Sequence, residues 1–375
     1  MILTIQTLFN DPNIVGAIIN RVNQTRKDSI YWQQYMDFKQ TTTRVFKDYT
    51  GTITGVMAGS INSRYGEKPI RQRGETGSMY GEVAYLGDKY QMSKDRLSDL
   101  QDLIDKYNVA KTSDQVSALN EIVNFLYDDF RQVSLAAHKR MDIVVASLLM
   151  TGSATVYNKD GAKNEDGSDA ASLLNIDMPM NFLKPAKSDV TVDAKIKFIS
   201  WLQNKLEEIS PDYGEYSKII MSRKTFIKNV VGSSEFGDVF KMQLSQNQMY
   251  LSTGLVTSDL ASQMFTGIGL PSIEIKSDYV KEKDGKNKAI YVDDRMTLLP
   301  QDKIGYMRHH TPYESTDPED GRTYTPAGNA ATSGQMLISN YRDHEGRYME
   351  YTAEWIPQFT APQLITNIDL SLVNA

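Results

Sequence analysis

The clearest pattern in the chain is a run of apolar residues at helical spacing between residues 113 and 151. Apolar side chains recur there every three or four positions, and no proline or glycine interrupts them until Gly152, so the pattern predicts one continuous helix. Ser113 or Asp114 can cap its start, and Thr151-Gly152 can end it. At about 1.5 Å per residue it would be roughly 55–60 Å long, far beyond the typical globular helix. A helix of this length spans a domain.

The first 40 residues are predicted to form an arm with little core of its own. Asp11-Pro12 signals a helix start, and an apolar stripe follows it. The polar stretch beyond that stripe carries four aromatic residues, Tyr31, Trp32, Tyr35 and Phe38. Because the arm offers them few apolar neighbours, we expect another copy of the chain to cover them. These four residues are therefore predicted to lie in an inter-subunit interface.

Residues 41–92 change character to strand-favouring residues interspersed with glycine. This composition predicts a long two-stranded loop that extends from the body of the protein. A lone hairpin is only marginally stable in water, so the loop is more plausible if it lies on a neighbouring subunit.

The tip of this loop is basic, with Arg64, Lys68, Arg71 and Arg73, although the protein is acidic overall, with a net charge of −6. Three interpretations stay open: contact with phosphate, ion pairs against an acidic neighbouring surface, and a solvated loop. The acidic net charge and the lack of a recognisable nucleic-acid motif argue against phosphate. We favour the ion pairs and predict these four residues in an inter-subunit interface.

The rest of the chain contains both helical and extended patterns, and we expect a mixed fold of the α+β class. Residues 93–108 predict a short helix capped by Ser93, and residues 190–310 predict an α/β unit with a hairpin turn at Asp284-Gly285. A loop-rich stretch follows over 311–345. The final extended segment, 346–374, contains Pro357 and Pro362, which favour an edge or bent strand.

Composition limits the chemistry. The chain has no cysteine, which removes disulfides, thiolate metal sites and cysteine nucleophiles. No run of about 18 apolar residues occurs, so we expect no membrane span. The serine-hydrolase motif G-x-S-x-G, the P-loop and the dinucleotide-binding glycine motif are all missing. We therefore expect no enzyme activity and no cofactor.

Metal sites are also not expected. The polar loop at 157–172 fails the calcium-loop pattern, because Glu165 stands where a glycine is needed when Asp160 is the first ligand. His309 and His310 are adjacent, and neighbours on a strand point to opposite faces, so they cannot easily share a metal. His138, in the long helix, is expected to face solvent or a partner.

The order of segments resembles the Hong Kong 97-type capsid fold of tailed phages, and most closely the phage lambda-like major capsid proteins. The resemblance assigns residues 1–40 to the N-terminal arm, 41–92 to the extended β-hairpin loop and 93–189 to a peripheral domain with the spine helix at 113–151. It assigns 190–345 to an axial domain and 346–375 to a strand that returns to the peripheral domain. It extends over nearly the whole chain. The residues of the type phage's isopeptide cross-link match no motif here, so no cross-link is predicted.

The resemblance implies a shell subunit that self-assembles into hexamers and pentamers of an icosahedral head around double-stranded DNA, without sequence specificity. Implied partners are further copies of the chain, a separate scaffolding protein and a portal, with a decoration protein as a further candidate. The implied location is the virion, with assembly in the host cytoplasm. Three alternatives remain open: an encapsulin-type nanocompartment shell, another virion structural protein such as a tail protein, and an uncharacterised hydrolase.

Overall fold

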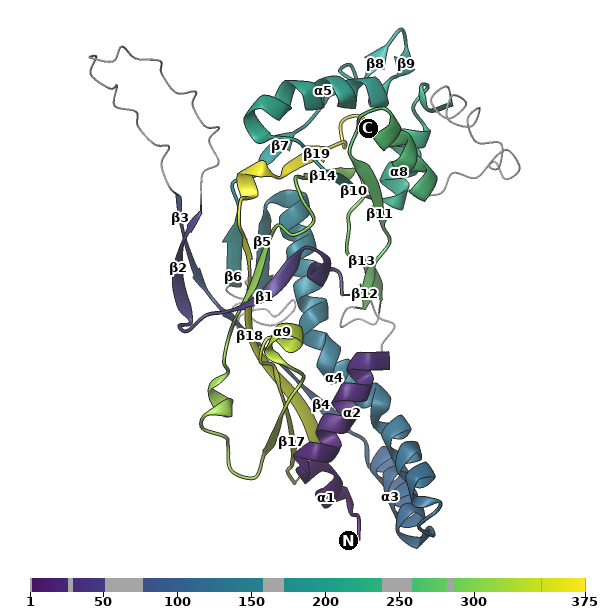
Figure 1. The fold of residues 1–375 in the computed structure, drawn as a ribbon, viewed down its shortest axis with the longest axis vertical. Coiled ribbons are helices and arrows are strands. Elements are labelled where there is room, and N and C mark those ends of the chain that lie inside the picture. The colour runs from purple at the N-terminus through teal and green to yellow at the C-terminus, as the bar shows by residue number, and fades with distance from the viewer. Residues whose placement is uncertain are drawn as a thin grey trace, which may run out of the picture. The chain divides into compact units, whose positions relative to one another are not determined.

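The computed structural model describes residues 2–25, 30–50, 77–157, 172–237, 258–281, 286–344 and 346–374. Helices and strands are mixed along the chain, which confirms the α+β class (Figure 1). The chain divides into two compact units. Unit 1 contains Met1–Phe46, Tyr80–Asp142 and Tyr306–Gln358, and unit 2 contains Lys47–Met79, Ile143–Gly305 and Phe359–Ala375.

The predicted long helix is confirmed as α4, Gln115–Thr151, which has 37 residues. Its first part, up to Asp142, belongs to unit 1 and packs beside α3, Lys94–Val109 (Figure 1). Ion pairs join these two helices: Arg96 contacts Asp129 at 2.7 Å, and Lys106 contacts Glu121 at 2.6 Å. Ser93 caps α3, as its sequence predicts, by accepting a hydrogen bond from the backbone N–H of Arg96.

The N-terminal segment forms two helices in unit 1, α1 (Ile5–Asn10) and α2 (Pro12–Thr25). Thr4 and Thr7 form a reciprocal capping box that starts α1. Proline has no backbone N–H, so Pro12 is well placed at the first position of α2, where that N–H would have no partner in the helix. The 3-10 turn Trp32–Gln34 then leads into strand β1, Met36–Gln40.

The sheet of unit 1 has the strand order β1-β15-β18-β17-β16, and β4 also pairs with β18. Its remaining strands are β4 (Ala84–Met92), β15 (Gly305–His310), β16 (Thr323–Pro326), β17 (Leu337–Arg342) and β18 (Arg347–Phe359). β18 has 13 residues, nearly all buried. It is therefore the central strand of the unit.

The prediction of an edge strand for the final segment is wrong, because β18, which contains Pro357, lies between β15 and β17. The alternative of a bent strand stays a prediction. The pairing registers explain why a proline is tolerated there. The ladder of β18 with β17 ends at Thr352, and its ladder with β4 ends at Trp355. Pro357 comes after both, so its missing N–H costs neither of these two ladders a hydrogen bond, and the other neighbour of β18 is β15.

The sheet of unit 2 has the order β11-β10-β14-β19-β7. Its strands are β7 (Asn181–Leu183), β10 (Lys218–Ser222), β11 (Ser272–Lys276), β14 (Arg295–Leu299) and β19 (Thr366–Asp369). Helices α5 (Phe198–Tyr213) and α8 (Ser258–Gly267) pack on it, and their apolar residues share one core with the strands. The C-terminal segment contributes β19, which lies between β14 and β7 in this sheet.

The C-terminal end of α4 is bonded to this sheet within unit 2. The backbone carbonyl of Leu149 accepts hydrogen bonds from the Thr297 hydroxyl at 3.0 Å and from the Asn367 amide at 3.3 Å. Thr297 and Asn367 lie opposite each other on β14 and β19, and both are fully buried. Carbonyls in the last turn of a helix have no partner inside it, so these side chains satisfy one of them.

Two predicted strand pairs are present, and a third short pair was not predicted. β2 (Val45–Thr50) pairs with β3 (Gly77–Glu82), which gives the two-stranded ribbon predicted for the extended loop. β12 (Tyr279–Lys281) pairs with β13 (Asn287–Ala289) as the predicted hairpin. β5 (Ser153–Tyr157) pairs with β6 (Ser172–Asp177). The hairpin turn Asp284-Gly285 and the polar loop at 158–171 lie outside the described residues.

The two units cut across the five predicted segments. Residues from Tyr306 to the end of the predicted 190–345 segment belong to unit 1, and three strands of its sheet, β15, β16 and β17, include residues of this stretch. The C-terminal residues from Phe359 belong to unit 2. The assignment of peripheral and axial roles to these parts of the chain stays a prediction.

Candidate interface site at the root of the β2–β3 ribbon

The predicted interface residues of the extended loop, Arg64, Lys68, Arg71 and Arg73, lie outside the described residues. The predicted arm residues are described, and their surroundings correct the prediction. Tyr31, Trp32 and Tyr35 are at most 1% exposed within this one chain, and Phe38 is half-buried. Buried side chains cannot meet a neighbour, so the three belong to the core of unit 1.

The cover over these aromatic residues comes from distant parts of unit 1. The ring of Trp32 stacks on His138 of α4 with centroids 5.8 Å apart, and His138 lies 4.9 Å from Trp355 of β18. Phe38 meets Trp355 edge-on at 5.0 Å. His138 is only 2% exposed, so the expectation that it faces solvent or a partner is wrong. We call Trp32, Phe38, His138 and Trp355 the aromatic cluster.

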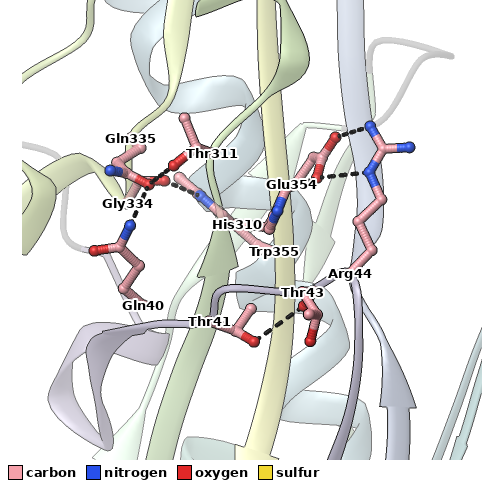
Figure 2. Close-up of polar contacts among 10 residues, drawn as sticks. All are labelled: Gln40, Thr41, Thr43, Arg44, His310, Thr311, Gly334, Gln335, Glu354 and Trp355. Carbon is pink, nitrogen blue, oxygen red and sulfur yellow. Dashed lines mark hydrogen bonds and ion pairs between the residues drawn. The ribbon is translucent and has the colours of Figure 1, made fainter. Parts of the chain in front are cut away.

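Gly334 closes the aromatic cluster on one side. It ends α9, Ala330–Ser333, in the left-handed conformation, with φ of +51°. Its carbonyl accepts a hydrogen bond from the indole N–H of Trp355 at 2.9 Å (Figure 2). A Cβ atom at this position would lie 2.7 Å from Phe38 Cδ1 and 2.7 Å from Trp355 Nε1. The packing therefore requires glycine here.

A buried carboxylate lies at the root of the ribbon, on the residue before Trp355. Glu354, 1% exposed, accepts two hydrogen bonds from Arg44 and contacts His310 Nδ1 at 2.7 Å (Figure 2). The hydrogen bond and the charge of Glu354 raise the pKa of Arg44. Arg44 directly precedes β2, and its carbonyl accepts a hydrogen bond from Val83 N–H, on the return side of the ribbon. We call Arg44, Glu354 and His310 the root network.

Two further contacts surround the root network. The Tyr85 hydroxyl donates to Glu314 Oε1 at 3.0 Å, and Glu314 is 5% exposed. The Thr311 hydroxyl donates to Gln335 Oε1 at 2.6 Å (Figure 2). His309 and His310 lie on opposite faces of β15: His309 meets Phe38 edge-on at 5.5 Å, whereas His310 contacts Glu354. The prediction that the two imidazoles point to opposite faces of the strand is therefore confirmed.

The contacts of the root network position a segment of the chain. Within the described ranges, no group of three His, Asp or Glu side chains could hold a metal ion. No helix among those described is long and apolar enough to cross a bilayer. What the root network does is hold both ends of the ribbon, at Arg44 and Val83, on the sheet of unit 1. Sequence reasoning missed it because Arg44 and Glu354 are 310 residues apart.

We expect Glu354→Gln to lower the free energy of unfolding by about 1–2 kcal/mol, because it removes the charge from the hydrogen bonds to Arg44 and His310. The effect is at the low end for charged hydrogen bonds, since the Arg44 side chain is 50% exposed and can be rehydrated. Urea unfolding measures it. Arg44→Met should cost a similar amount, and the double variant less than the sum of the two. Simple additivity would show that the two residues do not interact.

The stability of unit 1 should fall below about pH 6.5. Burial holds the pKa of His309 below its ordinary value of about 6.5, so the unfolded chain binds the proton more tightly than the folded chain. The contribution of neutral His309 to the free energy of unfolding is therefore complete above pH 6.5. It is lost as the pH falls towards the pKa of His309 in the folded state. His309→Gln should reduce the pH slope of the unfolding free energy by at most about 1.4 kcal/mol per pH unit. An unchanged slope, equal to that of the exposed-site control His344→Gln, would contradict this assignment.

Comparison with known proteins gives a match in structure. No protein-family model matches the chain, and no curated protein matches it in sequence. The crystal structure of a protein assigned as the capsid protein of a prophage of Escherichia coli CFT073 is similar to it, with a TM-score of 0.55 and 11% identity. This match covers 96% of the present chain and 98% of that chain.

Two further solved structures match more weakly. A phage-related protein from Bordetella bronchiseptica RB50 has a TM-score of 0.47 at 9% identity, over 96% of this chain and 98% of that one. A chain of the satellite phage P4 procapsid has a TM-score of 0.42 at 8% identity, and the match covers 96% of this chain and 91% of that one. At such identities the likeness is one of fold, and it rests on the first match. The chain therefore has the fold of the Escherichia coli prophage capsid protein, and the Hong Kong 97-type phage capsid fold predicted from its sequence fits the structure.

Proposed function

We propose that this chain is the major capsid protein of a tailed phage, which self-assembles into hexamers and pentamers of an icosahedral head around double-stranded DNA. The observation that carries the proposal is the fold shared with the prophage capsid protein over 96% of this chain and 98% of that one. Almost nothing of either chain lies outside the match. A shared fold alone does not imply shared function, so the experiment below tests assembly directly.

The β2–β3 ribbon is the feature of the chain that suits a shell subunit. Two strands by themselves are marginally stable in water, so a long two-stranded segment gains most when another surface covers it. The root network holds the two ends of the ribbon on the sheet of unit 1, which limits the conformational freedom lost when the ribbon meets a neighbour. Burial of apolar surface between subunits would contribute about 25 cal/mol per Å² before those ordering costs.

The basic residues Arg64, Lys68, Arg71 and Arg73 would pair with acidic side chains of the next subunit. Charge pairs at the rim of an interface affect register and association rate more than affinity. Partners beyond the chain itself would be a separate scaffolding protein, a portal and, as a further candidate, a decoration protein. The virion would be the final location, with assembly in the host cytoplasm.

The purified protein, alone and co-expressed with a scaffolding protein from the same phage, tests the proposal by light scattering and negative-stain electron microscopy. We expect ring-shaped capsomers or closed shells. Tubes would favour a tail protein, and a strictly monomeric species under every condition would contradict the proposal.

The loop interface has its own test. Replacing Arg64, Lys68, Arg71 and Arg73 by glutamate should reduce shell yield at least tenfold and leave the unfolding midpoint of the monomer unchanged. Reversal of two exposed basic residues, Lys94 and Lys111, is the matched control and should leave the yield near that of the unchanged chain. Equal yields from both variants would show that the basic tip lies outside the interface.

A further inference from the structure

Strand β18 carries a buried arginine on its first residue. Arg347 is 5% exposed, and its Nη1 has no hydrogen-bond partner among the residues that the structure describes. Directly opposite it on β17 lies a second cation, Arg342. Like charges facing each other across a strand pair destabilise the pair. Among the residues that the structure describes, Arg347 thus faces another cation and forms no ion pair.

A buried amide lies on the same face of the sheet. Asn340 is fully buried, and neither its Nδ2 nor its Oδ1 has a partner in the described part of the chain. Asn340 pairs with Met349, two residues beyond Arg347 on β18. Paired residues share a face, and so do residues two apart on one strand, so Asn340 and Arg347 point the same way. As diagonal neighbours they lie about 7–8 Å apart at Cα, within reach of one small ligand.

Helix α1 covers this face. The guanidinium of Arg347 lies over the ring of Phe9, 4.7 Å from its centroid, and Phe9 is fully buried. The helix is held in place at its start, where Leu3 and Asn108 exchange two hydrogen bonds of 2.9 and 2.8 Å. A bulky phosphate or a peptide carboxylate could reach Arg347 only if α1 moved away. A ligand here must be small.

No described residue balances the charge of Arg347. A buried guanidinium without a counter-charge is costly, and a buried amide with both atoms unpaired adds to that cost. The face of Phe9 offsets only part of it, since a cation–π contact contributes about 0.5–2 kcal/mol. Burial and the charge of Arg342 lower the pKa of Arg347. A small anion would balance the charge and accept hydrogen bonds from both side chains.

We propose that Arg347 and Asn340 bind a halide-sized inorganic anion, such as chloride, beneath helix α1. The guanidinium N–H of Arg347 and the amide Nδ2–H of Asn340 donate hydrogen bonds to it. The anion joins β17, β18 and the covering helix, so it stabilises the N-terminal segment of unit 1. The proposal does not depend on shell formation and is tested on the unassembled full chain.

The first measurement is the unfolding of the full chain by urea in sodium bromide and in sodium gluconate at equal ionic strength. A specific site raises the folding equilibrium constant by a factor of 1 + [anion]/Kd, about 100-fold at 100 times Kd. Arg347→Met and Asn340→Leu, which keep the approximate size of each side chain, should each reduce that factor to within about twofold of unity. Arg342→Met removes the exposed cation and is the matched control, which should retain the bromide effect.

The second measurement does not depend on whether a variant folds. A crystal of the unaltered chain grown in sodium bromide should show anomalous bromine density within hydrogen-bond distance of Arg347 Nη1 and Asn340 Nδ2. Density for water alone at that position, or a bromide effect that Arg347→Met and Arg342→Met reduce equally, would overturn the proposal.

Discussion

Gly334→Ala is expected to lower the free energy of unfolding of unit 1 by about 2–5 kcal/mol. The left-handed backbone of residue 334 alone costs about 1–2 kcal/mol for an L side chain. The added methyl group would also overlap Phe38 and Trp355, two rings with little room to move, and overpacking a core costs about 1–3 kcal/mol more.

Urea unfolding followed by tryptophan fluorescence measures this loss, because Trp32 and Trp355 both lie in the aromatic cluster. Gly321→Ala is the matched control. Gly321 has a φ of +78°, but a Cβ there would meet nothing within 4 Å, so its substitution should cost the backbone strain alone. Equal losses at the two positions would show that the aromatic cluster is not tightly packed around Gly334.

Trp32→Ala should destabilise the unassembled protein by about 3–5 kcal/mol, the range found when a large core side chain is truncated. Trp32 is fully buried, stacks on His138 and lies 6.3 Å from Trp355. Its backbone N–H also donates to Asp142 at 2.9 Å, a bond that the substitution leaves in place. The loss of unfolding free energy therefore measures what the indole ring contributes to the core.

This experiment separates a core residue from an interface residue. If Trp32 lay in an inter-subunit interface, Trp32→Ala would leave the monomer stable and prevent assembly. Tyr313→Ala is the control in unit 1, because Tyr313 is 50% exposed, and its truncation should change the unfolding free energy by less than about 0.5 kcal/mol. A stable Trp32→Ala monomer that fails to assemble would contradict the assignment of Trp32 to the core.

Local patterns predicted those elements whose stability is largely local. The helix α4 could be predicted because its apolar positions keep one period over 37 residues without a break. The ribbon β2–β3 and the hairpin β12–β13 could be predicted from strand-favouring residues on both sides of glycine-containing stretches of sequence. Each of these signals lies within one stretch of sequence.

Contacts between distant segments could not be predicted in this way. Trp32 has few apolar neighbours close in sequence, and the rings that cover it, Trp355 and His138, come from other elements of the chain. Glu354 is one acidic residue among many until β18 places it beside Arg44 and His310. Pro357 indicated an edge strand because the ends of the β17 and β4 ladders are not visible in the sequence.

A cryo-electron microscopy reconstruction of particles formed by the purified protein with its scaffolding protein would show whether this chain builds a closed shell. We expect an icosahedral shell in which each subunit has the fold described above and the β2–β3 ribbon of one subunit lies on another. Open tubes, or a shell built from a different polypeptide, would contradict it.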